Sequence, residues 1–184
     1  MKRKTAKEIL SDSFRELAQV KPVDRITVKD ITDNCGYSQA TFYRQFRDKY
    51  DLIIWDYTQT VAEIVGKGGK DGYEWRKTLL ETAYFFENKK EYLSNLFLHT
   101  SGMDSFVQYM SDIHAGSLTK LILECSGRDK LDLQTEMLIR LYCHGAVCLT
   151  WEWILGRYEV SPEELADVFE KALPAPLHPF LFKK

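Results

Sequence analysis

The chain has 184 residues, a formal net charge of −2 and 45% hydrophobic residues, which suffices for one domain or for a small domain joined to a larger one. The charge is uneven: residues 1–50 hold 11 Lys and Arg against 7 Asp and Glu, whereas residues 51–184 hold 14 against 20. A basic front on an acidic body is expected where one end of a protein faces phosphate. The chain lacks the ~18 consecutive apolar residues of a membrane span and the apolar run of a signal peptide, so we expect a soluble, cytoplasmic protein.

Hydrophobic residues recur at helical spacing along nearly the whole chain, and alternating strand patterns are scarce. The sequence therefore predicts an all-α protein of about nine helices. We expect a three-helix domain over residues 1–48 and a helical bundle over residues 49–184.

Turn and capping residues divide the first part of the chain. A helix begins at Ala6 and ends near Val20, before a proline that blocks its continuation. A capping box of Thr27 and Asp30 opens a short second helix, with Asp in place of the usual Glu or Gln, and Gly36 ends it. A third helix is expected from Ser38 through Phe46, and Asp48 caps a fourth that runs toward Val65.

The remaining helices follow a glycine- and lysine-rich break at residues 66–72, which should be a flexible connection. Ser161, followed by Pro162 and Glu164, is a typical helix start. The periodicity predicts five helices after the break, over residues 75–86, 92–98, 104–125, 131–155 and 162–173.

The second and third helices are short, joined by a turn with a glycine and preceded by a longer helix, which is the arrangement of a helix-turn-helix. Gln39, Thr41 and Arg44 can project toward base edges, where Gln pairs with adenine and Arg with guanine. Tyr43 can hold a phosphate or pack as an aromatic. The apolar residues expected to fix the angle between the helices are Ile26, Val28, Ile31, Cys35, Tyr37, Phe42 and Phe46.

These segments resemble the N-terminal domain of the TetR family. The resemblance rests on Ile26 to Ile31, Cys35 to Phe46 and Asp48 to Leu52, which hold a Thr opening helix two, a Gly in the turn, Thr-x-Tyr-x-x-Phe and a Lys before a Leu. It covers roughly residues 5–60. It implies a DNA-binding regulator, a repressor more than an activator, whose predicted DNA contacts are Thr27, Lys29, Ser38, Gln39, Ala40, Thr41, Tyr43, Arg44 and Lys49.

The same resemblance implies a homodimer formed by C-terminal helices and a core that binds a small effector or is controlled by a protein partner. More loosely, residues 52–55, 73–75, 86 and 88–92 resemble the subgroup that regulates dihydroxyacetone kinase operons. The residues predicted at the dimer interface are Leu138, Leu141, Tyr142, Gly145, Leu149, Glu152, Val168, Phe169 and Leu173.

The C-terminal part is rich in aromatic residues, which at helical spacing are more often core than pocket. The residues predicted to line an effector pocket are Trp75, Phe86, Phe97, Phe106, Tyr109, Met110 and Trp151.

We expect neither catalysis nor a cofactor. The isolated acids form no acid–base pair, and no phosphate-binding loop is present. The four cysteines form no Cys-x-x-Cys pair and three lie in strongly apolar helical stretches, so we expect them to be reduced and buried. Cys143, His144 and Cys148 lie on one helix and cannot close a tetrahedral metal site alone. Two rival hypotheses remain open: a helical interaction module without DNA binding, which the net charge of −2 favours, and a helical enzyme.

Overall fold

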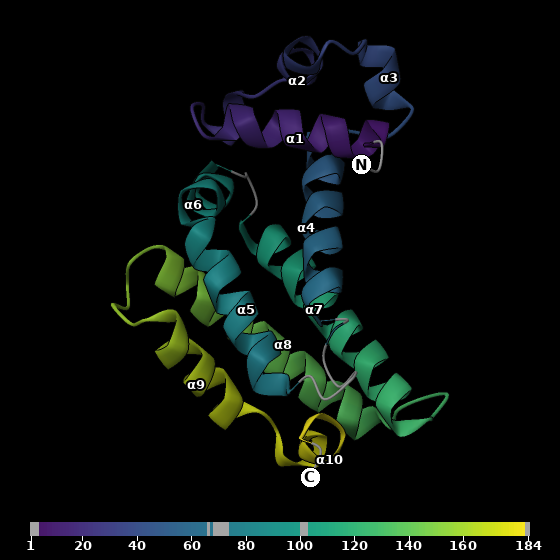
Figure 1. The fold of residues 1–184 in the computed structure, drawn as a ribbon, viewed down its shortest axis with the longest axis vertical. Helices are drawn as coiled ribbons and strands as arrows, with labels where there is room; N and C mark the ends of the chain where they lie inside the picture. Colours follow the sequence, from purple (N-terminus) through teal and green to yellow (C-terminus); the bar gives the residue numbers. More distant parts are fainter. Residues whose placement is uncertain (1–3, 66, 68–73, 100–102, 183–184) are drawn as a thin grey trace. The chain divides into compact units, whose positions relative to one another are not determined.

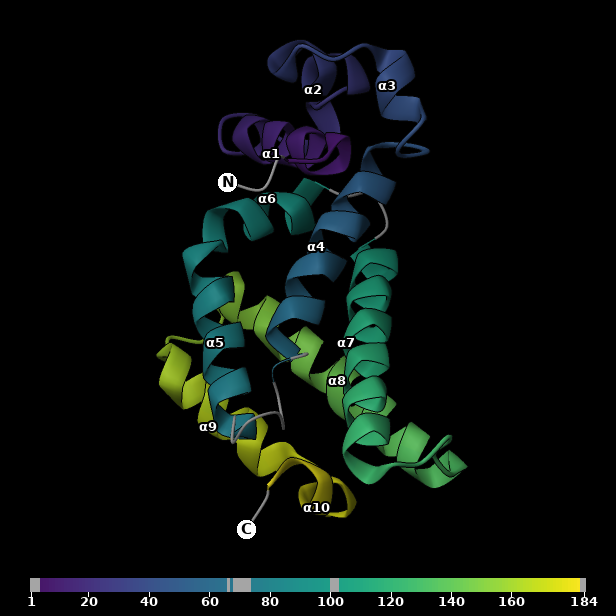
Figure 2. The same cartoon turned by 45° about the vertical axis from the view of Figure 1, so that its right-hand side comes forward.

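The structure is a computed structural model that describes residues 4–65, 67, 74–99 and 103–182; at residues 97, 99 and 103–105 only the backbone is described. Figures 1 and 2 show α-helices and no strand among the described residues. The same residues also form two short 3-10 turns. The predicted all-α class is confirmed. Ten α-helices occur among the described residues, where about nine were expected, because the proline-rich tail forms a further short helix, α10 (His178–Leu181).

The chain divides into two compact units. The first comprises Met1–Gln59 with Glu91–Met103, and the second comprises Thr60–Lys90 with Asp104–Lys184. The first unit thus extends beyond the boundary expected after residue 48 and takes in a later segment. The long helix α4 (Lys49–Val65) begins in the first unit and ends in the second.

In the first unit, α1 (Ala6–Ala18) packs against α2 (Val28–Cys35), and α2 is followed by α3 (Gln39–Tyr43). The Ser13 hydroxyl links the first two helices, because it donates to Ile31 O at 2.7 Å and accepts from the Asn34 amide at 3.0 Å. The fully buried residues Leu10, Phe14 and Ile31 form part of the core.

The residues predicted to cap the helices of this unit do so. The Asp30 N–H donates to Thr27 Oγ1 at 3.1 Å and the Thr27 N–H donates to the Asp30 carboxylate at 2.8 Å, which completes the capping box. Hydrogen bonds from Lys21 and Thr27 lower the pKa of Asp30. Gly36 ends α2 with φ +73°, a left-handed conformation that glycine adopts without strain. Ser38 caps α3 and Asp48 caps α4.

Helix α3 is shorter than predicted, since it ends at Tyr43 instead of Phe46. The following residues form a turn in which the Gln45 N–H donates to Phe42 O at 2.8 Å. Phe46 is nevertheless buried as expected, and its ring lies 5.7 Å from that of Phe42.

The 3-10 turn η1 (Val23–Arg25) between α1 and α2 is held by two side chains. Asn95, on α6 (Lys90–His99), accepts from Val23 N–H at 3.0 Å and donates to Ala18 O at 2.7 Å and Lys21 O at 2.9 Å. Lys49 donates to the carbonyls of Val23, Asp24 and Ile26 at 2.8, 3.0 and 2.8 Å. Burial lowers the pKa of Lys49.

The second unit contains α5 (Trp75–Asn88), α7 (Met103–Ser126), α8 (Leu133–Ile154) and α9 (Pro162–Ala172), followed by η2 (Ala175–Leu177) and α10. Helix α5 packs against α9 and also contacts α8 (Figures 1 and 2). Arg76 on α5 forms ion pairs with Asp167 at 2.5 Å and Glu170 at 2.7 Å, both on α9.

Replacing Asn95 by Ala removes three hydrogen bonds at once and leaves the Val23 N–H without its partner. A part-buried polar group that loses its partner costs about 1–3 kcal/mol, so we expect Asn95→Ala to lower the free energy of unfolding by about 2 kcal/mol in urea. The matched control is Asn88→Ala, at an exposed position of α5, which should change stability by less than ~0.5 kcal/mol. Equal effects of the two changes would contradict a structural role for Asn95.

Candidate functional sites

Helix α3 buries one face and exposes the other. Phe42 is fully buried and contacts the edge of the Tyr43 ring, with 5.5 Å between the ring centroids. The residues of this segment that remain exposed are Gln39, Ala40, Tyr43 and Arg44. This exposed face therefore carries an amide, a methyl group, a phenol and a guanidinium.

Thr41 holds the Arg44 side chain. The Arg44 guanidinium donates to Thr41 Oγ1 at 3.0 Å, and the hydroxyls of Thr41 and Ser38 lie 3.1 Å apart. Thr41 is half-buried, and its hydroxyl already has partners within the helix. The guanidinium is thereby held close to the helix while its remaining N–H donors stay available.

The other predicted DNA contacts fall into two groups. Thr27, Lys29 and Ser38 are exposed, and Lys29 forms an ion pair with Asp33 on the next turn of α2. Lys49 is half-buried, and its three N–H donors go to backbone carbonyls of the η1 region. An ammonium has three donors, so in this conformation Lys49 has none left for a phosphate.

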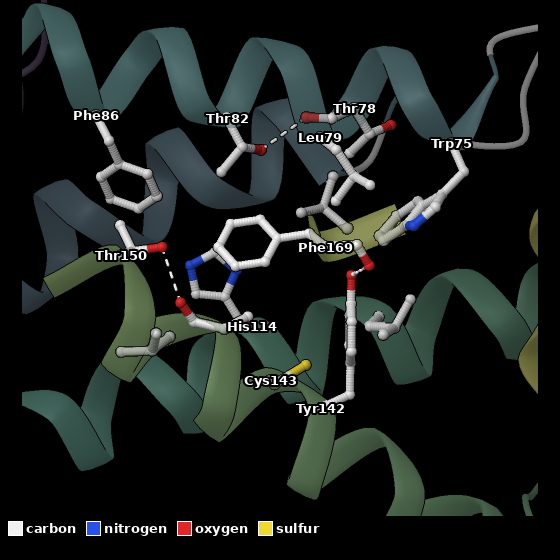
Figure 3. Close-up of a pocket in the computed structure, with 14 residues that line it drawn as sticks. Trp75, Thr78, Leu79, Thr82, Phe86, His114, Tyr142, Cys143, Thr150 and Phe169 are labelled. Carbon is white, nitrogen blue, oxygen red and sulfur yellow. Dashed lines mark hydrogen bonds between the residues drawn. The ribbon is translucent and has the colours of Figure 1, made fainter. Parts of the chain in front are cut away.

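A cavity of about 60 Å³ lies inside the second unit. Helix α5 forms one side of it and α8 the other (Figure 3). Two residues of α7, the last residue of α4 and one residue of α9 complete the lining. We call it the α5–α8 cavity. Its lining residues are Val65, Trp75, Thr78, Leu79, Thr82, Phe86, His114, Leu118, Tyr142, Cys143, Ala146, Val147, Thr150 and Phe169.

The polar groups of the cavity are uncharged. Although a part of His114 remains accessible, enclosure of its imidazole lowers its pKa to about 4, so the ring is neutral at pH 7. Burial raises the pKa of the Cys143 thiol to about 12. Thr82 and Thr150 donate their hydroxyl protons to carbonyls of their own helices, both at 2.8 Å.

Two polar atoms of the cavity lining are buried and have no hydrogen-bond partner among the described residues: Trp75 Nε1 and Thr78 Oγ1. Figure 3 shows the indole nitrogen of Trp75 turned toward the Tyr142 hydroxyl, which itself donates to Phe169 O at 3.0 Å. Burial raises the pKa of Tyr142, whereas the neighbouring Trp75 indole lowers it. Trp75 Nε1 nevertheless makes no hydrogen bond to the Tyr142 hydroxyl.

The α5–α8 cavity contains two of the residues predicted for an effector pocket, Trp75 and Phe86. Phe106 and Met110 are buried without lining it, Tyr109 is 51% exposed, and the Phe97 side chain lies outside the described residues. Trp151 is half-buried and does not line it either.

Thr78, Thr82 and His114 also line the cavity and were not predicted to do so. A signal existed for Thr82, because Trp75, Leu79, Thr82 and Phe86 follow one another at intervals of four, three and four residues. This spacing places them on one face of a helix.

A groove of about 250 Å³ lies between α8 and α9. We call it the α8–α9 groove. Seven of its lining residues are apolar side chains or glycine on the two helices. The full lining is Leu141, Tyr142, Gly145, Ala146, Leu149, Val168, Phe169, Ala172 and Pro174.

Six of the nine residues predicted at a dimer interface line this groove, and Leu141, Gly145 and Val168 are exposed there. Leu138 and Glu152 are half-buried on α8, and Leu173 is buried at the end of α9. Leu133 and Met137, about two turns and one turn before Leu141, are also largely exposed and were not predicted.

The cavity and the groove share a wall. Tyr142, Ala146 and Phe169 line both. The hydrogen bond from Tyr142 to Phe169 O crosses this wall and ties α8 to α9. Any displacement of these residues by an occupant of the cavity therefore also reshapes the groove.

Within the described ranges, no group of three or more His, Cys, Asp and Glu residues is placed to hold a metal ion. The free cysteines there are Cys35, Cys125, Cys143 and Cys148. In the same ranges, we find no helix with the length and apolar character needed to cross a membrane.

Comparison with known proteins matches both parts of the chain to regulators. Residues 10–54 match the family described as "Bacterial regulatory proteins, tetR family", and residues 73–174 match a "Transcriptional regulator C-terminal region" of TetR proteins. A curated relative, the HTH-type dhaKLM operon transcriptional activator DhaS of Lactococcus lactis subsp. lactis (strain IL1403), is 23% identical over 99 residues. That alignment covers 54% of this chain and 52% of the relative, so the match spans about half the length of DhaS.

Solved structures share the fold over nearly the whole chain. A structure of the dihydroxyacetone kinase operon activator DhaS has a TM-score of 0.68 at 21% identity, over 96% of this chain and 98% of that one. A TetR regulator from Streptococcus agalactiae 2603V has a TM-score of 0.63 at 16% identity, over 91% and 93%. A TetR regulator from Rhodococcus sp. RHA1 has a TM-score of 0.67 at 15% identity, over 94% and 97%. With its helix-turn-helix and its C-terminal region both matched, the chain belongs to the TetR family of transcriptional regulators.

Proposed function

We propose that this TetR-family regulator binds operator DNA by placing α3 in the major groove. The exposed face of α3, held in place by the buried Phe42, carries this proposal. A Gln amide can bond the N6 and N7 edge of adenine, an Arg fork can bond guanine, and the Ala40 methyl can contact a thymine methyl. Because Thr41 holds Arg44, less side-chain freedom is lost when that guanidinium binds a base.

Phosphate contacts would set the register of α3 on the duplex. Tyr43 is 57% exposed beside Arg44, and Thr27, Lys29 and Ser38 are exposed at or near the starts of α2 and α3. Hydroxyls, phenols and ammonium groups bond phosphate without reading sequence. We omit Lys49 from these contacts because its donors bind the η1 region, and we assign it the role of positioning α4.

Dimerisation through the α8–α9 groove would place two α3 helices in successive major grooves, roughly 34 Å apart. Its exposed apolar side chains, of which Leu141 is 73% exposed, gain stability when a second copy removes them from water. A Cβ built on Gly145 would meet no atom within 4 Å, so a partner helix can approach the backbone closely there.

Effector control would act through the α5–α8 cavity. A ligand that binds one dimer arrangement better than another shifts the population toward the first. The shared wall of Tyr142, Ala146 and Phe169 supplies a route, because an occupant of the cavity contacts residues that also line the groove. A protein co-regulator remains the alternative source of control.

We propose repression as the sign of regulation, since a dimer bound over a promoter excludes polymerase. The relative DhaS is described as an activator, so the experiment must distinguish repression from activation. Genomic fragments selected by the protein identify the operator, and a reporter under that operator, with and without the protein, gives the sign. Lower reporter output with the protein supports repression, and higher output contradicts it.

Arg44→Ala should weaken binding to the selected operator about 5- to 150-fold, the effect of losing one bidentate base contact. Binding to unrelated DNA should change far less. The measurement is a titration of both duplexes at fixed salt, and circular dichroism checks that the fold is retained. Arg128→Ala is the matched control, because it removes the same charge from an exposed position in the second unit.

The alternative, an interaction module without DNA binding, predicts that the chain has no sequence preference for DNA. If the genomic selection recovers no sequence preference, and binding shows no steep dependence on salt concentration, DNA recognition by α3 is contradicted. Equal losses of operator affinity in Arg44→Ala and Arg128→Ala would show that Arg44 contributes only its positive charge and no base contact.

Leu141→Glu should weaken self-association at least ~10-fold, because a carboxylate would be buried in an apolar interface without a partner. Sedimentation equilibrium over a range of protein concentrations measures the effect. The control is Val20→Glu, which adds the same charge at an 84% exposed apolar residue of the first unit and should leave association unchanged. A monomeric wild-type chain, or equal behaviour of the two variants, would rule out this interface.

A further inference from the structure

The α5–α8 cavity has a lining that selects strongly by charge. None of its 14 lining residues is Asp, Glu, Lys or Arg, and the imidazole of His114 is neutral because burial lowers its pKa to about 4. An ion placed in such a site loses its hydration and gains no counter-charge. The occupant must therefore be uncharged.

Size limits the occupant as well. The 60 Å³ of this cavity is at least four times the roughly 10–15 Å³ that a single buried water needs, so it has room for a small molecule of several heavy atoms. Apolar side chains such as Leu79, Phe86 and Val147 make up most of the wall. A ligand that fits without rearrangement is a compact molecule with a mainly hydrocarbon body.

The unpartnered donor adds a chemical requirement. Trp75 Nε1 can donate a hydrogen bond but cannot accept one, it is buried, and no described residue accepts its proton. Buried donors are nearly always paired. The Thr78 hydroxyl, one turn along α5, is in the same situation. An oxygen acceptor on the ligand would satisfy one or both donors, which no purely apolar occupant can do.

We infer that the α5–α8 cavity is a binding site for a small, uncharged molecule with a hydrogen-bond acceptor oxygen, such as a carbonyl, that takes the indole proton of Trp75. Only the ligand's role as an effector rests on the proposed function. The site itself can be tested in the full chain without DNA, so its failure and the failure of DNA recognition are separable.

Acetone and acetate provide a matched pair of probes, because they have the same number of heavy atoms and nearly the same shape but differ in charge. The chain has four tryptophans, so a proton–nitrogen correlation spectrum of the ¹⁵N-labelled protein has four indole signals. Trp75→Phe identifies the signal of Trp75. The Trp153 indole is an internal reference, because it already donates to Val160 O at 2.8 Å.

Acetone should move the Trp75 indole proton to higher frequency in a saturable manner, with half-saturation between about 0.1 and 30 mM, the range open to a ligand of four heavy atoms. The Trp153 signal should stay in place, and acetate at matched ionic strength should move neither. Without ligand, the Trp75 proton should resonate at lower frequency than that of Trp153, because it lacks an acceptor.

Two variants at Thr82, a half-buried lining residue, separate filling of the cavity from loss of a hydroxyl. Thr82→Leu should abolish the response to acetone by occupying the space, whereas Thr82→Val, of nearly the same size as Thr, should preserve it. Both variants lose the same hydrogen bond to Thr78 O, so they differ chiefly in volume.

The inference is overturned if acetone produces no saturable shift of the Trp75 signal in the wild-type chain, if acetate acts equally, or if the Trp75 and Trp153 signals move together. It is also overturned if the ligand-free Trp75 proton already resonates where a bonded indole does, since Tyr142 would then be its acceptor. These indole shifts are measured on the wild-type protein, so they test the inference even if Thr82→Leu does not fold.

Discussion

The burial of Phe42 is the constraint on which the proposed DNA recognition depends. A helix of five residues cannot form alone, since nucleating a helix costs more than so few hydrogen bonds return. Helix α3 exists because Ser38 caps it and the fully buried Phe42 ring fixes it in the core of the first unit. Removing such a ring from water contributes about 1.5–3 kcal/mol. The same contact decides which face of α3 points outward, and so places Gln39 and Arg44 at the surface.

The helices of the second unit do not fill the volume between them completely. Helices α5, α7, α8 and α9 enclose a cavity whose polar groups are neutral and incompletely paired, and α8 and α9 leave an apolar groove on the surface. Tyr142 and Phe169 belong to both. Protein interiors are close-packed and transmit small displacements, so this shared wall can couple the proposed ligand to the geometry of the proposed dimer.

Features set by local hydrogen bonding could be predicted from the sequence. The capping box at Thr27, the left-handed Gly36 and the cap at Ser38 need only a few neighbouring residues. The cavity could not be predicted as well, because helical periodicity reveals which face is buried but not which helix covers it. Trp75 was therefore found, while His114, which comes from another helix, was missed. The donors of Lys49 likewise reach carbonyls more than twenty residues away.

The most direct test of DNA recognition by α3 is whether Gln39 confers the base preference that we propose for it. Selection from a random pool of duplex DNA should give the wild-type chain an inverted repeat whose half-sites lie about one helical turn, or a multiple of one turn, apart. Selection with Gln39→Ala should return the same repeat with the preference lost at one position, an adenine, in each half-site. An unchanged motif, or the loss of preference at every position together, would contradict base recognition by the exposed face of α3.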